Sequence, residues 1–182
     1  MAAILRKGIS MRSIKLAFPI AVFAIIAAAF PVFAQDSVFS HPDVEYSFSI
    51  PDSTWRITSR PSTTSPNVEY VYGDRRDGHL EVRKLTVPRN AILVDVIEDE
   101  ESKQQFLRGF VAGKEENFAG RLRGTVFNFE YVQDGRNMIG RHYFLRANET
   151  TVYVLRFTGQ KDSLRSLRNQ TDSIARTFAV KS

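Results

Sequence analysis

Few residues in this chain can do acid–base or metal chemistry, and they are widely spaced. The 182-residue sequence contains three histidines and no cysteine. His41, His79 and His142 have neither a second histidine nor a cysteine at the spacing of a metal site, and no H-E-x-x-H pattern occurs. A histidine without such neighbours more often faces solvent or is held by structural contacts than catalyses a reaction. We therefore expect a structural role for all three histidines.

Other catalytic patterns are absent from the sequence as well. There is no G-x-S-x-G nucleophile turn, no G-x-G-x-x-G loop and no Walker motif. A small hydrolase that uses two carboxylates stays an alternative, because the distance between carboxylates is not visible in a sequence. We assign no catalytic, cofactor-binding or metal-binding residues, expect no cofactor, and predict that the protein is not an enzyme.

Two groups of charged residues could bind ions or partners. The acidic run 95–101 lacks the D-x-D-x-D-G spacing of a calcium loop, so we interpret it as the negative charge at the start of a helix. Several arginines could form a basic sheet face for an anion or an acidic partner, but a solvated sheet face is the favoured interpretation. These arginines are Arg75, Arg76, Arg121, Arg123, Arg136, Arg141 and Arg146.

The first 34 residues combine four basic residues with a long apolar run and contain no acidic residue. This pattern predicts a signal peptide over 1–34 that is removed, and a periplasmic or secreted protein. The alternative is an uncleaved leader that tethers an envelope protein to the membrane. Without this segment, 21 basic residues face 20 acidic ones. We therefore expect no nucleic acid as partner and no stable membrane insertion after cleavage.

The remaining chain reads as a spacer over 35–45 and a single α+β domain over 46–182. Predicted helices cover 91–118 and 162–178, where apolar residues recur at spacings of three and four. Apolar alternation and turn residues predict strands at 46–50, 55–57, 68–72, 79–87, 122–133, 137–147 and 151–157. The apolar positions change parity within 79–87, which indicates a bulge or burial on both faces. We expect an antiparallel sheet of about six to seven strands with two amphipathic helices, in a three-layer α/β/α sandwich.

An aromatic strand, a proline turn and the only tryptophan open this domain, as Phe48-Ser-Ile-Pro-Asp-Ser-Thr-Trp55. We interpret 46–57 as the opening hairpin and Trp55 as a core residue. This stretch and the amphipathic helix Leu164–Phe178 resemble the PsbP-like family, which includes the photosystem subunit PsbP, the Mog-type Ran-binding proteins and the envelope protein DcrB. The resemblance covers about residues 44–180. It implies an α/β/α sandwich and a non-enzymatic binding, assembly or envelope factor with a protein partner, and brings no catalytic residues with it.

Overall fold

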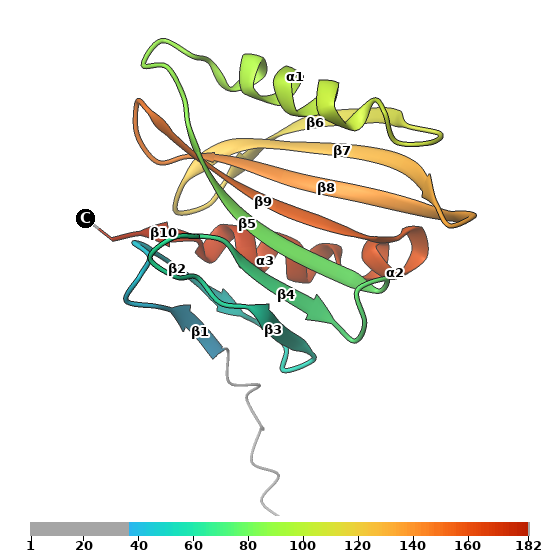
Figure 1. Cartoon of the computed structure of the whole chain (residues 1–182), viewed down its shortest axis with the longest axis horizontal. Helices are drawn as coiled ribbons and strands as arrows, with labels where there is room; N and C mark the ends of the chain where they lie inside the picture. The colour runs from blue at the N-terminus through green and yellow to red at the C-terminus, as the bar shows by residue number, and fades with distance from the viewer. Residues whose placement is uncertain (1–36, 182) are drawn as a thin grey trace, which may run out of the picture. The chain divides into compact units, whose positions relative to one another are not determined.

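The computed structural model describes residues 37–181, so the expected signal peptide lies outside the described residues. Figure 1 shows the arrangement of the elements. The helices are α1 (Leu93–Gln104), α2 (Lys161–Ser166) and α3 (Arg168–Thr177). The strands are β1 (Ser37–Ser40), β2 (Tyr46–Ile50), β3 (Trp55–Ser59), β4 (Val68–Tyr72), β5 (Gly78–Thr86), β6 (Val111–Ala119), β7 (Arg123–Gln133), β8 (Arg136–Arg146), β9 (Thr151–Gln160) and β10 (Ala179–Val180). No helix within residues 37–181 has the length and apolar content needed to cross a membrane.

The central layer is a seven-stranded antiparallel sheet in the order β3-β4-β5-β9-β8-β7-β6. Its longest hairpin joins β7 to β8, with Gln133 paired to Arg136. Asp134 and Gly135 both have positive φ angles, 51° and 74°. A two-residue hairpin loop favours this backbone because its twist matches that of the two strands. The expected antiparallel α+β architecture is confirmed.

One face of this sheet is covered by α2, α3 and a small sheet of order β1-β2-β10 (Figure 1). Aromatic side chains fill the space between these layers. The ring of Phe178, which follows α3, stacks on Tyr46 and Phe48 of β2, at centroid distances of 5.4 and 6.1 Å. Tyr153 of β9 lies 5.1 Å from the same ring. The larger of two hydrophobic cores is therefore aromatic and joins both sheets to α3.

The opposite face is covered by α1 and holds a smaller core. Val96 and Ile97 of α1 pack there with Phe127 and Phe144 of the sheet. The division into two faces also explains the parity change in β5. Leu80 belongs to the aromatic core, whereas the later part of the strand faces α1. Burial on both faces is thus the correct alternative, since the pairing of β5 with β9 runs without a register shift.

The opening stretch 46–57 is not a hairpin. Strand β2 pairs with β1 and β10, whereas β3 pairs with β4 in the seven-stranded sheet. The chain therefore changes sheets between the two strands. Residues 37–40, which the sequence places in a spacer, form β1, because Phe39 is buried beside Phe48 at a centroid distance of 4.9 Å. The interpretation of Trp55 as a core residue is confirmed, as it is 4% exposed.

Both predicted helices differ from the observed elements. The first helix ends at Gln104, and residues 111–119 form the edge strand β6. Gly109, with φ of 64°, allows the chain to reverse between them, in a conformation that glycine adopts without strain. The apolar spacing was misleading because Phe106 is 92% exposed and contributes to no buried stripe. The terminal helix is divided at Leu167, whose backbone (φ −88°, ψ 4°) departs from the helical conformation.

Candidate functional site

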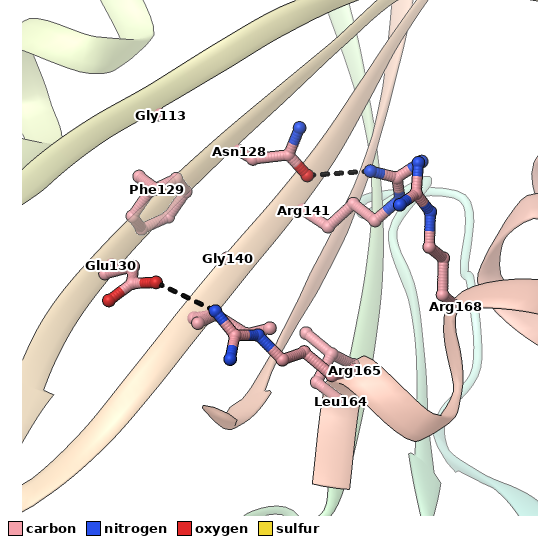
Figure 2. A pocket seen from close by; sticks show the side chains of 10 residues that line it. Gly113, Asn128, Phe129, Glu130, Gly140, Arg141, Leu164, Arg165 and Arg168 are labelled. Atoms are coloured by element: carbon pink, nitrogen blue, oxygen red, sulfur yellow. Dashed lines mark hydrogen bonds and ion pairs between the residues drawn. The ribbon is translucent and has the colours of Figure 1, made fainter. Parts of the chain in front are cut away.

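A cavity of about 210 Å³ lies between strands β7 and β8 and the helical segment formed by α2 and the start of α3. Figure 2 shows that arginine side chains from the sheet and from the helical segment converge on it. Its lining residues are Gly113, Asn128, Phe129, Glu130, Ile139, Gly140, Arg141, Leu164, Arg165 and Arg168. We call this cavity the arginine pocket.

Arg141 of β8 forms the buried side of the arginine pocket and is 9% exposed. Its guanidinium donates to Asn128 Oδ1 at 2.7 Å and to Asp172 Oδ1 of α3 at 2.9 Å. Its Nε donates to the Tyr143 hydroxyl at 2.7 Å, and that hydroxyl donates to Asp172. Burial raises the pKa of Tyr143, so the phenol stays a donor. Arg141 is therefore occupied in holding α3 against the sheet.

Arg165 and Arg168 form the open rim of the arginine pocket, with side chains 58% and 60% exposed. Arg165 lies 3.3 Å from Glu130, which also accepts from Lys161 at 2.6 Å. Arg168 lies 3.4 Å from Glu116 of β6. Exposed ion pairs of this kind contribute about 0–1 kcal/mol each. Both rim guanidiniums can therefore exchange their present partner for another carboxylate at little cost.

The lining beneath the rim is largely apolar. Ile139 and Leu164 contribute aliphatic side chains, and Gly140 contributes bare backbone. A Cβ atom at Gly140 would lie 2.1 Å from Cζ of Phe129, its cross-strand neighbour. The strand must therefore carry glycine beside this ring. A cavity with cationic rim groups above apolar walls suits a carboxylate that enters with part of its carbon chain.

The arginine pocket offers charged groups for binding, namely three guanidiniums and one carboxylate. Glu130 is the only carboxylate in the lining. Elsewhere in the described chain, the hydrogen bonds of Lys84 and Tyr153 lower the pKa of Glu45 to about 2, and a backbone hydrogen bond lowers the pKa of Asp52. A catalytic carboxylic acid needs a raised pKa. Within residues 37–181, no group of three histidine, aspartate or glutamate residues is placed to hold a metal ion.

None of the three histidines lines the arginine pocket. His41 lies 3.7 Å from Asp43, and His79 lies 3.0 Å from Glu69. His142 is buried under α1, where neither ring nitrogen has a hydrogen-bond partner among the described residues. Burial, with the nearby cations Arg156 and Arg83, lowers the pKa of His142 to about 3. It is therefore neutral at pH 7.

The seven arginines that could have formed a basic sheet face are dispersed. Arg141 is buried in the arginine pocket, and Arg146 bonds to the Ala91 carbonyl at 2.8 Å. Arg121 and Arg123 are exposed at the start of β7. Arg75, Arg76 and Arg136 line a separate cavity of about 150 Å³ beside the hairpin loops. The disfavoured alternative of a basic sheet face does not match this arrangement, because β-strand parity and hairpin position separate these side chains.

Sequence reasoning did not single out Arg165 and Arg168, since both belong to the polar side of the terminal amphipathic helix. Their spacing of three residues was the available signal, because residues three apart share a helix face. That spacing does not show which strands the face meets. Glu130 and Glu116 come from two different strands and approach these arginines only in the folded sheet.

No protein-family model and no curated protein sequence matches this chain. Solved structures do match. The yeast (Saccharomyces cerevisiae) Ran-binding protein Mog1p superposes with a TM-score of 0.59 at 10% identity, over 81% of this chain and 96% of Mog1p. Cyanobacterial PsbP from Synechocystis gives 0.55 at 16% identity, over 85% and 98%. LpqN of Mycobacterium tuberculosis gives 0.55 at 16% identity, over 81% and 91%.

This chain has the PsbP-like fold. The likeness confirms the resemblance seen in Phe48–Trp55 and in the terminal helix. At these identities the PsbP-like fold is what the superpositions show, and the arginine pocket must be judged on its own geometry.

Proposed function

We propose that this protein is an exported, non-catalytic binding factor that docks a protein partner through an acidic group held in the arginine pocket. The observation that carries the proposal is the pair of exposed guanidiniums, Arg165 and Arg168, above an apolar lining. The cavity, about 210 Å³, is smaller than the roughly 300–1,000 Å³ of typical small-molecule sites. It fits a side-chain or chain-terminal carboxylate better than a whole substrate.

The structural relatives support a binding role in the envelope. Mog1p is described as a Ran-binding protein, and LpqN as involved in cell envelope biogenesis. The alternative of a carboxylate-dependent hydrolase lacks comparable support. Among the described residues, the displaced carboxyl pKa values of Glu45, Asp52, Asp74 and Glu100 all move downward, which favours the ionised form.

Export rests on the basic and apolar pattern of residues 1–34. Mass spectrometry of the protein from its native source tests this part of the proposal. We expect the mature chain to begin near Gln35. A chain that retains residues 1–34 in the membrane fraction would favour the tethered alternative instead.

Docking is tested by affinity capture from native envelopes with the wild type and R165Q/R168Q. The double variant removes both rim charges and changes only exposed ion pairs, so folding should be preserved. The matched control is R121Q/R123Q, which removes two exposed arginines at the start of β7. We expect a partner that the wild type and the control both retain and R165Q/R168Q loses. Equal recovery by all three proteins would contradict docking at the arginine pocket.

A further inference from the structure

The segment around α1 exposes apolar side chains at both ends of the helix. Ile92 (59% exposed) and Val94 (46%) lie at its start, and Phe106 (92%) and Val111 (61%) follow its end. Within residues 37–181, one other large apolar residue, Val38, is exposed. A single exposed apolar residue is ordinary in a soluble protein, but this concentration within twenty residues is not. The two ends lie about 20 Å apart along the helix.

Acidic side chains fill the stretch between these apolar ends. Asp95, Glu98 and Asp99 are exposed, and none of them forms an ion pair with another described residue. The helix begins at Leu93, so only Asp95 lies in its first turn. The interpretation of 95–101 as a helix-start cluster is therefore only partly correct. Asp95 and Asp99, four residues apart, repel each other by a few tenths of a kcal/mol, and helix stability does not explain them.

A groove runs beside these carboxylates. Its volume is about 400 Å³, and it lies between α1 and the segment that leaves β5. Leu85, Val87, Pro88, Ala91 and Val96 provide an apolar lining. Asp95 and Asp99 belong to the same groove, as do Glu100 and Lys103, which pair with each other at 2.6 Å. An apolar floor with acidic groups suits a lysine or arginine side chain, whose aliphatic part can be buried while its cationic end meets a carboxylate.

We propose that the outer face of α1, from Ile92 to Val111, with its adjoining groove, binds a basic segment of a protein partner that also carries apolar side chains. The basic residues would pair with Asp95, Glu98 and Asp99, and the apolar residues would cover Ile92 and Phe106. Charge complementarity decides the occupant. In 95–101, Glu100 faces inward and pairs with Arg156. The other four acids of this run, Asp95, Glu98, Asp99 and Glu101, form no ion pair with another described residue. Their negative charge repels nucleic acid and anionic lipid headgroups.

Figure 1 shows α1 on one face of the seven-stranded sheet and α2 and α3 on the other. Because the arginine pocket is lined by α2 and the start of α3, the surface on α1 lies on the opposite face. The proposal for the α1 surface rests on the proposed function in one respect, which is that the protein is a binding factor. The two surfaces have opposite charge and no residue in common. The loss of one therefore leaves the other to be measured alone.

The test is fluorescence anisotropy of the mature protein with a labelled amphipathic peptide that carries leucines on one helical face and lysines on the other. The site variant is D95N/E98Q/D99N, which keeps side-chain shape and removes three charges. The matched control is E115Q/D134N/D162N, which removes three exposed acidic residues elsewhere. F106S tests the apolar contribution, and R165Q/R168Q tests independence from the arginine pocket.

We expect D95N/E98Q/D99N to weaken peptide binding by about tenfold or more, in a salt-dependent manner, and F106S to weaken it by a smaller factor. The control and R165Q/R168Q should bind like the wild type, and a peptide with glutamate in place of lysine should not bind. Equal weakening by the site variant and its control would overturn the proposal. So would binding of phosphatidylglycerol vesicles, or a dimer of this chain that F106S abolishes in analytical ultracentrifugation.

Discussion

The two faces of the seven-stranded sheet treat buried charge differently. Beneath α3, the buried guanidinium of Arg141 finds Asn128, Tyr143 and Asp172 as partners. Beneath α1, Arg156 pairs with Glu100, but its Nε has no hydrogen-bond partner among the described residues. Neither ring nitrogen of His142 has a hydrogen-bond partner among these residues. An unpaired buried polar group costs free energy that a paired one does not.

This difference indicates that the packing on the α3 face is the more stable of the two and that the packing on the α1 face is less stable. The α3 face joins two sheets through a large aromatic core. The α1 face has one helix, a smaller core and exposed apolar residues. Surfaces that bind partners are often drawn from the less stable parts of a fold.

Truncation of a core residue on each face compares the two cores directly. Phe178→Ala should lower the free energy of unfolding by about 3–5 kcal/mol, because the ring contacts β2 and β9. Ile97→Ala, in α1, should fall at the low end of about 2–5 kcal/mol, because the helix can settle into the space. Urea unfolding measures both. A cost for Ile97→Ala equal to that for Phe178→Ala would contradict the contrast.

Neutralising the acid of one buried ion pair on each face compares how much each pair contributes to the free energy of unfolding. Glu100→Gln should cost free energy at the low end of about 3–5 kcal/mol at pH 7, since it leaves the buried Arg156 with Glu81, 3.6 Å away, as its remaining counter-charge. Asp172→Asn should cost about 1.5–3 kcal/mol, because Arg141 keeps Asn128 and Tyr143.

The pH dependence of these costs can be assigned as well. Burial opposes ionisation of Glu100, but Lys103 and Arg156 outweigh it and lower its pKa. The stabilisation is therefore present above the carboxyl pKa of the unfolded chain and is lost as pH falls through the folded value. Urea unfolding of the wild type and Glu100→Gln at decreasing pH should show the difference shrinking. A constant difference would contradict the assignment.

His142 should make the α1 face sensitive to mild acid. Its pKa falls from 6.5 to about 3 on folding, so below pH 6.5 the unfolded chain binds a proton that the folded chain does not. Stability should drop by about 2 kcal/mol between pH 7 and pH 5 from this group. His142→Leu should remove that part of the pH dependence. Parallel stability curves for the two proteins would mean that His142 is not held neutral.

The smallest effect concerns the exposed charges on each face. R165Q/R168Q and D95N/E98Q/D99N should each change the free energy of unfolding by no more than about 1 kcal/mol. Thermal unfolding followed by circular dichroism measures this. A larger loss would assign these residues to folding rather than to partner binding, and would remove one argument for both proposed surfaces.

Several elements could be predicted because their information is local. Alternation of apolar residues located β2 and β7, and Asp134-Gly135 located the hairpin that follows β7. Strand β6 could not be predicted in the same way. It is an edge strand with one buried residue, Phe118, so it carries no alternating pattern. Its conformation depends on pairing with β7 rather than on its own residues.

The candidate site was less predictable than the fold. The sequence identified Arg141 as one of seven arginines, without a reason to prefer it. Its partner Asp172 lies 31 residues away, and Glu100 lies 56 residues from Arg156. These pairs form only because the sheet order and the positions of the helices bring them together.

The sequence by itself determined the strands with one buried face, the amphipathic C-terminal segment and the burial of Trp55, because each follows from a local period of apolar residues. The tertiary structure alone decided that β2 leaves the main sheet, that Arg165 and Arg168 border a pocket, and that three acids of α1 face outward whereas Glu100 faces inward. The physical reason is that a strand's partners and a helix's covered face depend on contacts between distant residues, which local periodicity does not encode.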